Sequence, residues 1–169
     1  MTPAAPLRAL TVDRPRDIRA TPSEIGTILV ATDLGPVSEA AVNQAIALAA
    51  RLRARLLVIS VIESRHLGNA GGLGARFDQV RDKREQGAGR IVERGRQAGV
   101  SVRFLVWEGE AGEAILDAAS AEGVDMIVVG TRGRGGMERL LMGSVSEHVV
   151  RHASVPVLVV RPTLAAAGA

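Results

Sequence analysis

The segment 130–146 carries the residue types best suited to holding an anion. Five of the 19 glycines lie within 130–143, and glycine lets a ligand approach the backbone closely. Gly143 precedes the expected start of a helix, where unpaired backbone N–H groups and the helix dipole favour negative charge. Arg132 and Arg134 add positive charge. The candidate phosphate contacts are Gly130, Arg132, Gly133, Gly143, Ser144, Val145 and Ser146.

Two features bear on how this segment is interpreted. Ser144 and Glu147 match the S-x-x-E capping box, which predicts the helix start independently of any ligand. Glycine-rich loops also occur in α/β proteins that bind nothing. The sequence contains no G-x-x-x-x-G-K-[ST] loop, and no G-x-G-x-x-G follows the first strand. A nucleotide-binding P-loop and a dinucleotide-dependent dehydrogenase are therefore not predicted.

The sequence gives weaker support for a metal site or a phosphoryl acceptor. His148 and His152 stand four residues apart on one helix, as metal ligands can, but no third ligand is apparent. We favour helix surface or dimer packing for this pair. A hydroxyl of Ser144 or Ser146 could accept a phosphoryl group, although a cap or a ligand contact is the simpler role. Asp33 is the one carboxylate that we place at the predicted site.

Alternating strands and helices must position these residues. Apolar, β-branched runs predict strands, and stripes at helical spacing predict helices between them. Strands that read as unbroken apolar runs are typical of a parallel sheet covered on both faces. We predict one doubly wound α/β three-layer sandwich with four helices and a five-stranded parallel sheet of order 3-2-1-4-5. The strands are expected at 27–33, 55–63, 102–109, 125–130 and 155–161, and the helices begin near Ser38, 76, 111 and Ser144.

In such a sheet a ligand binds beyond the carboxyl ends of the strands, where the strand order reverses. That point lies between the first and fourth strands. The first strand ends at Asp33 and the fourth ends at Gly130, so the candidate phosphate loop opens directly from the switch point.

The composition excludes several function classes. The 169 residues contain no cysteine, which rules out disulfides, thiolate metal sites and cysteine nucleophiles. The only aromatic residues are Phe77, Phe104 and Trp107, so stacking platforms for single-stranded nucleic acid are not expected. We expect Trp107 to lie on an outer strand, away from the switch point.

Charge and organisation suggest a cytoplasmic domain. The net charge is only +3, and the basic residues are interleaved with acidic ones, so we expect no nucleic-acid partner. No apolar run is long enough to cross a membrane, and no secretory signal is apparent. Prolines punctuate residues 1–24, which we expect to form a flexible arm. The domain is expected over 25–162, followed by a disordered tail at 163–169.

The spacing of the motif points to a family. Gly130, Gly133, Gly143 and Ser144 follow the pattern G-x2-G-x9-G-[ST], which resembles the ATP-binding branch of the universal stress proteins. The segments ILVATDLGPVSEAAV, EGEAGEAILDAA and VPVLVVR resemble the same family. The resemblance covers roughly residues 25–162 and leaves the N-terminal arm outside.

The resemblance implies roles for individual residues. The glycine motif with Ser144, Val145 and Ser146 would hold the triphosphate and ribose. Asp33 matches the family's acidic residue beside the nucleoside, and Val61 matches the position whose backbone contacts adenine. Because aromatic residues are scarce, we expect adenine to lie between aliphatic side chains and backbone amides.

The resulting prediction is an ATP-binding regulatory protein of the stress response with slow or negligible turnover. ADP or AMP could occupy the same contacts, and any Mg²⁺ is expected to be bound through the phosphates. The last strand, at 155–161, would be an apolar edge, and the family pairs such strands, so we expect a homodimer there. Two alternatives remain: a nucleotide-independent interaction module that uses the 66–75 loop or the N-terminal arm, and a slow ATPase or autophosphorylating protein.

Overall fold

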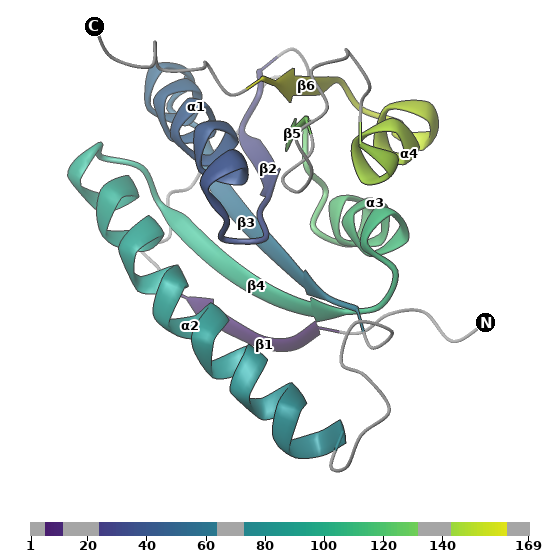
Figure 1. The fold of residues 1–169 in the computed structure, drawn as a ribbon. Helices are drawn as coiled ribbons and strands as arrows, with labels where there is room; N and C mark the ends of the chain where they lie inside the picture. The colour runs from purple at the N-terminus through teal and green to yellow at the C-terminus, as the bar shows by residue number, and fades with distance from the viewer. Residues whose placement is uncertain (1–5, 12–23, 64–72, 132–142, 162–169) are drawn as a thin grey trace, which may run out of the picture.

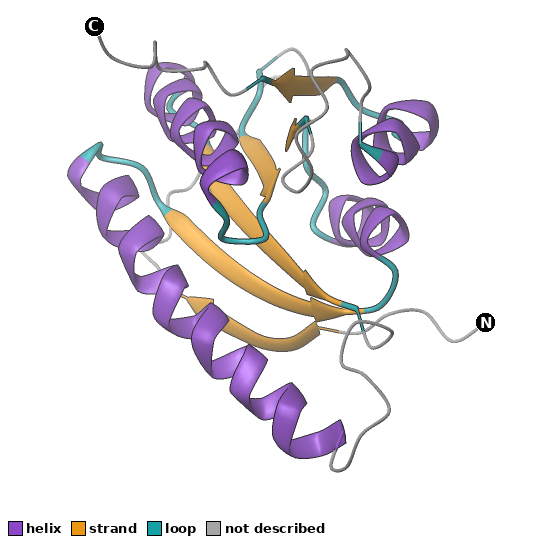
Figure 2. Ribbon diagram, in the orientation of Figure 1, coloured by secondary structure: helices purple, strands orange, loops and turns teal. Residues whose placement is uncertain are grey.

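The computed structural model describes residues 6–11, 24–63, 73–131 and 143–161, and in these ranges a six-stranded sheet lies between two pairs of helices (Figure 1, Figure 2). The strands are β1 (Pro6–Thr11), β2 (Thr27–Ala31), β3 (Arg55–Ile62), β4 (Val102–Glu108), β5 (Met126–Gly130) and β6 (Val157–Val160). The helices are α1 (Pro36–Leu52), α2 (Leu73–Gln97), α3 (Ala111–Ala121) and α4 (Ser144–His152). None of the described helices is both long and apolar enough to span a bilayer.

The sheet has the predicted parallel topology. Its strand order is β1-β4-β3-β2-β5-β6, and every neighbouring pair from β4 to β6 is parallel. Counted from β2, this is the order 3-2-1-4-5 with four helices, which confirms the predicted fold class. The order reverses between β2 and β5, so the switch point lies where expected.

Two apolar layers flank the sheet. Alternate residues along each strand point to opposite faces, so Ile28 of β2 packs beneath α1 and α2 whereas Leu29 packs beneath α3 and α4. Both side chains are fully buried. Such two-sided burial explains why the strands are unbroken apolar runs. The core is almost entirely aliphatic; Phe104 and Trp107 on β4 are its described aromatic residues.

Strand β1 departs from the prediction of a flexible arm over residues 1–24, which is wrong for Pro6–Thr11. This segment pairs antiparallel with β4, from Pro6 opposite Trp107 to Thr11 opposite Arg103, with a register shift between Pro6 and Arg8. The strand that carries Trp107 is therefore not the outer one. Pro6 is tolerated because a proline at the first residue of an edge strand removes no essential ladder hydrogen bond. The predicted tail at 163–169 lies outside the described residues.

Helix α2 is continuous although Gly87, Gly89 and Gly95 weaken its helical propensity. Two of these glycines allow close packing. A β-carbon on Gly95 would collide with Val102 of β4, and one on Gly87 would lie 2.5 Å from Cδ1 of Leu34. The glycines therefore let α2 lie close to the sheet and to the turn that follows β2.

Candidate functional site

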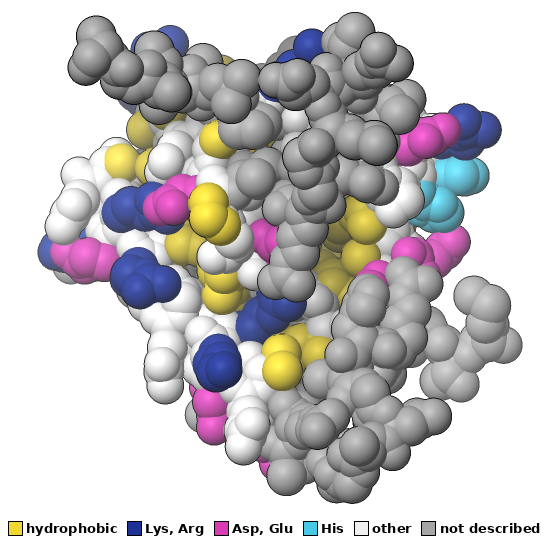
Figure 3. Space-filling model, viewed as in Figure 1, with side chains coloured by type: hydrophobic (Ala, Val, Ile, Leu, Met, Phe, Trp, Pro, Cys, Tyr) yellow, Lys and Arg dark blue, Asp and Glu magenta, His cyan; other side chains and the backbone are white. Residues whose placement is uncertain are grey.

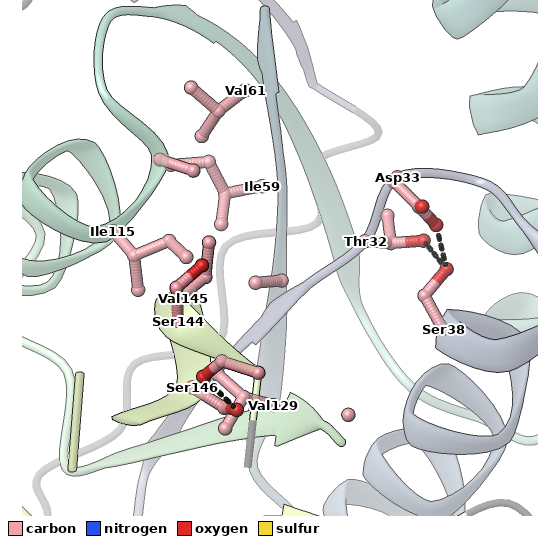
Figure 4. A pocket seen from close by; sticks show the side chains of 14 residues that line it. Thr32, Asp33, Ser38, Ile59, Val61, Ile115, Val129, Ser144, Val145 and Ser146 are labelled. Carbon is pink, nitrogen blue, oxygen red and sulfur yellow. Dashed lines mark hydrogen bonds between the residues drawn. The ribbon is translucent and has the colours of Figure 1, made fainter. Parts of the chain in front are cut away.

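A cavity of about 240 Å³ lies at the switch point, where the carboxyl ends of β2, β3 and β5 meet the N-termini of α3 and α4 (Figure 4). It brings together Asp33, Val61, Gly130 and the segment 143–146 of the predicted site. Arg132 and Gly133, which were also predicted, lie outside the described residues. The described lining residues are Ala31, Thr32, Asp33, Ser38, Ile59, Val61, Ala111, Ile115, Val129, Gly130, Gly143, Ser144, Val145 and Ser146.

The turn after β2 holds Asp33 at one side of the cavity. Its Oδ1 accepts hydrogen bonds from the backbone N–H of Gly35 at 2.8 Å and from the Ser38 hydroxyl at 2.7 Å. Leu34 within the turn has a φ of 62°, a left-handed conformation that reverses the chain sharply. Helix α1 begins at Pro36 with Gly35 as its N-cap, ahead of the start expected near Ser38. The Ser38 side chain lies in the first turn of α1 and fixes the carboxylate of Asp33.

The N-terminus of α4 lies at the cavity, and its first turn lines it. Gly143 is its N-cap and provides no side chain, and the predicted capping box between Ser144 and Glu147 is not formed. Glu147 instead pairs with Arg151 at 2.7 Å. The Ser146 hydroxyl is buried and donates to the carbonyl oxygen of Gly143 at 2.9 Å. This bond stabilises the first turn, and among the described residues no side chain is hydrogen-bonded to the N–H groups of Ser144, Val145 or Ser146.

The N-terminus of α3, at the same cavity, differs in its electrostatics. Glu63 Oε1 accepts from the N–H of Ala111 at 3.0 Å, and Glu110 Oε2 accepts from the N–H of Glu113 at 3.1 Å. Carboxylates thus occupy the positive end of this helix. Of these two helix N-termini, α4 is the one suited to an anionic ligand.

The remaining walls are aliphatic. Ile59 and Val61 project from β3, Val129 from β5, Val145 from α4 and Ile115 from α3 (Figure 4). Ile115 and Ala111, which also line the cavity, were not among the predicted site residues. Their spacing of four residues at the start of α3 is the signal that places both on one wall. The described lining contains no aromatic side chain, so a flat apolar group would meet methyl groups here.

His148 and His152 lie on the outer part of α4, away from the cavity lining. The rings are 4.4 Å apart between centroids, and His148 Nε2 lies 3.3 Å from Oε1 of Glu113 on α3. Figure 3 shows histidine side chains at the surface beside acidic ones. Among the described residues no group of three or more metal-ligating side chains is found. His148 thus packs α4 against α3, whereas His152 is exposed on the same helix.

A second hollow of about 480 Å³ lies on the other face of the turn after β2. It is bounded by the start of α1 and by α2, and Thr32 lines both this hollow and the cavity at the switch point. Its rim carries Glu39, Arg90 and Arg94, and Arg94 donates to Glu39 at 2.9 Å. Side chains of both charge signs therefore border this hollow, whereas the N-terminus of α4 presents positive partial charge to the first cavity.

Comparisons with known proteins agree with this architecture. The model of the universal stress protein family matches residues 24–161. A putative universal stress protein of Staphylococcus haemolyticus is 37% identical over 79% of this chain and 83% of its own length. A universal stress protein of Methanocaldococcus jannaschii is 31% identical over 79% and 81%.

Solved structures share the fold. The structure of a hypothetical protein, MJ0577, whose biochemical function was assigned from its structure, superposes with a TM-score of 0.74 at 24% identity, over 83% of this chain and 98% of that one. The universal stress protein of Archaeoglobus fulgidus in complex with dAMP has a TM-score of 0.62 at 22% identity, over 79% and 96%. An Arabidopsis thaliana family protein with AMP bound has a TM-score of 0.59 at 20% identity, over 82% and 93%. With a family match over 24–161 and relatives above 30% identity, the chain belongs to the universal stress protein family.

Proposed function

We propose that the cavity at the switch point binds an adenine nucleotide, ATP in particular, and that the protein is a regulatory module whose nucleotide occupancy controls a response to stress in the cytoplasm. The observation that carries the proposal is the contrast between the two helix ends: within the described part of the chain no side chain caps the N–H groups of α4, whereas carboxylates occupy the N-terminus of α3. The dAMP and AMP complexes of structural relatives support the same ligand class.

The contrast between the two helix ends also suggests how the nucleotide is oriented in the cavity. Phosphate oxygens would accept from the first turn of α4, beside Gly130 and Gly143, with Arg132 and Gly133 as further predicted contacts. The nucleoside would then lie towards Asp33 and Val61, between aliphatic walls. A carboxylate such as Asp33 suits a ribose hydroxyl, which can donate to it, and would repel a phosphate. Mg²⁺, where present, would be bound through the phosphates.

Turnover is proposed to be slow or negligible. Hydrolysis needs a base that activates water and a coordinated metal ion. Among the described lining residues Asp33 is the only carboxylate, and its Oδ1 is already held by Gly35 and Ser38. Such a site is better suited to retaining a nucleotide than to consuming it.

We further propose a homodimer through the strand at 155–161. Strand β6 forms one edge of the sheet, and Leu158 on it is 39% exposed. An apolar edge strand is normally paired or covered, and a second copy would cover this one. Light scattering at micromolar concentration should give the mass of two chains. A monomeric mass would contradict the dimer but not the nucleotide site.

Nucleotide binding is tested directly on the full chain. Protein purified without added nucleotide is denatured, and released adenine nucleotides are identified by mass spectrometry; titration calorimetry with Mg·ATP then gives the affinity. We expect Asp33→Ala and Gly143→Val to weaken binding at least tenfold, about 1.4 kcal/mol. Asp117→Ala, at an exposed carboxylate on the outer side of α3, should bind normally. If wild-type protein releases no nucleotide and gives no heat at millimolar ATP, the interaction-module alternative replaces this proposal.

A further inference from the structure

Ser60 is a polar residue at a fully buried position. It lies near the end of β3, and its side chain faces the α1 and α2 side of the sheet, opposite to the cavity lined by its neighbours Ile59 and Val61. A buried hydroxyl needs partners, because an unsatisfied one is costly. Ser60 has two: its Oγ donates to the carbonyl oxygen of Thr32 at 2.8 Å and accepts a hydrogen bond from Nη1 of Arg84 on α2.

This pair of bonds leads to the turn that carries Asp33. The N–H of Thr32 donates to the carbonyl oxygen of Ile59 at 2.9 Å, so both sides of the Thr32 backbone are held by β3. The Thr32 hydroxyl lies 2.8 Å from Ser38 Oγ, and Ser38 in turn donates to Asp33. A continuous set of hydrogen bonds therefore runs from Arg84, through Ser60, Thr32 and Ser38, to the carboxylate at the cavity.

We propose that Arg84 is a positioning residue of the nucleotide cavity, which acts through Ser60 to fix the Thr32–Asp33 backbone. It does not line the cavity itself. A guanidinium that donates to a hydroxyl polarises it and strengthens the bond that this hydroxyl donates onward. Gly87, three residues along α2, adds an apolar support from the same side by packing against Leu34 of the turn. The inference rests on the proposed function, because it assigns Arg84 to nucleoside affinity.

The position of Arg84 predicts a specific pattern of ligand affinities. Arg84 reaches, through Ser60, the turn that holds Asp33, on the nucleoside side of the cavity rather than at the N-terminus of α4. Loss of Arg84 should therefore weaken ATP and adenosine by the same factor. Since Arg84 acts through Asp33, its loss should have no further effect once Asp33 is replaced. A merely structural role would not produce this pattern.

The test is titration calorimetry of the full chain with ATP and with adenosine. We expect Arg84→Met and Ser60→Ala to weaken both ligands by about three- to tenfold, within the range seen for residues coupled to a site without touching it. Arg84→Lys, which keeps a cationic donor, should recover most of the affinity. Arg90→Met, an exposed arginine on the same helix, is the matched control. In an Asp33→Ala background, Arg84→Met should cause no additional loss.

Several results would overturn the inference. Wild-type affinity in a folded Arg84→Met protein would do so, and so would a loss confined to ATP, which would indicate a direct effect on the phosphates. If Arg84→Met fails to fold, Ser60→Ala carries the same test. Amide resonances of Thr32 and Asp33 in the ligand-free protein give a second readout: they should shift in Arg84→Met and not in Arg90→Met. Should wild-type protein bind no nucleotide, the proposed function fails, whereas unshifted resonances would refute the positioning role itself.

Discussion

The imidazole of His148 on α4 lies over the α-carbon of Gly112 on α3, so close that a β-carbon on Gly112 would stand 2.7 Å from His148 Cδ2. Gly112 and Ala111 form the first turn of α3, and Ser144 to Ser146 form the first turn of α4. The contact therefore sets the separation of the two helices that border the cavity. Beside this contact His148 Nε2 lies 3.3 Å from Oε1 of Glu113.

Gly112→Ala should lower the free energy of unfolding by about 1–3 kcal/mol, because the added methyl group overpacks the contact between α3 and α4. The matched control is Gly89→Ala on α2, where a β-carbon would meet nothing within 4 Å. That change should raise stability by about 0.8–1 kcal/mol through helix propensity. Urea denaturation measures both. Equal midpoints for the two variants would contradict the close contact, and His148→Ala should relieve most of the Gly112→Ala effect.

Removal of residues 1–11 should make the protein prone to association, because it uncovers the hydrogen-bonding edge of β4. Light scattering should show larger species than in the full-length protein. Emission of Trp107, the only tryptophan, should move to longer wavelength as its strand loses its neighbour. A synthetic peptide of residues 1–11 added in trans should suppress association, whereas a version with proline at Ala9 should not. Unchanged mass and emission after truncation would show that β1 does not protect this edge.

Asp125→Ala should destabilise the sheet at the start of β2. The Oδ2 of Asp125 accepts from the N–H of Gly26 at 3.0 Å and from the N–H of Thr27 at 2.8 Å. Hydrogen bonds to a carboxylate are strong, although partial exposure reduces their contribution, so we expect a loss of about 1–2 kcal/mol. Asp117→Ala is the control. Chemical denaturation gives the free energy of unfolding of each variant. A difference between the two below about 0.5 kcal/mol would mean that water replaces these hydrogen bonds.

Glu93 should titrate at unusually low pH. Hydrogen bonds from Arg96 and Gln97, at 2.7–3.0 Å, lower its pKa to about 2. A carboxyl whose pKa is lowered on folding stabilises the protein above its unfolded pKa, and this contribution is lost as the pH falls towards 2. Carboxyl chemical shifts followed by NMR should show the low midpoint. Molar salt should move it upward because the site is exposed, and Arg96→Met should restore an ordinary value.

The strands and helices of the domain are predictable because their local patterns and their tertiary environment agree. Val58 and Leu29 belong to runs that are apolar on both faces, and only a sheet covered on both sides buries such runs. Strand β1 is different: its pairing with β4 joins segments almost a hundred residues apart, and Pro6 within it reads locally as a breaker. Pro6 is compatible with the strand because it is the first residue of an edge strand.

The same distinction applies to the cavity. The convergence of Asp33 with Gly143 follows from topology, since both flank the switch point. The state of each helix end does not follow from a local motif. Ser144 and Glu147 have the spacing of a capping box, but Glu147 turns to Arg151, while Glu63 reaches Ala111 from a different strand. The contact that displaces the capping box lies within α4, four residues along, whereas the bond from Glu63 to the start of α3 spans 48 residues and is invisible in a short sequence window.

The two edges of the sheet are formed differently. Strand β1 pairs antiparallel with β4 and forms one border, and the parallel strand β6 forms the other. Pairing of β6 with the β6 of a second copy would be isologous, and two such edges satisfy one another completely. Growth of that kind ends with two sheets joined into one continuous layer, and a filament cannot propagate through it.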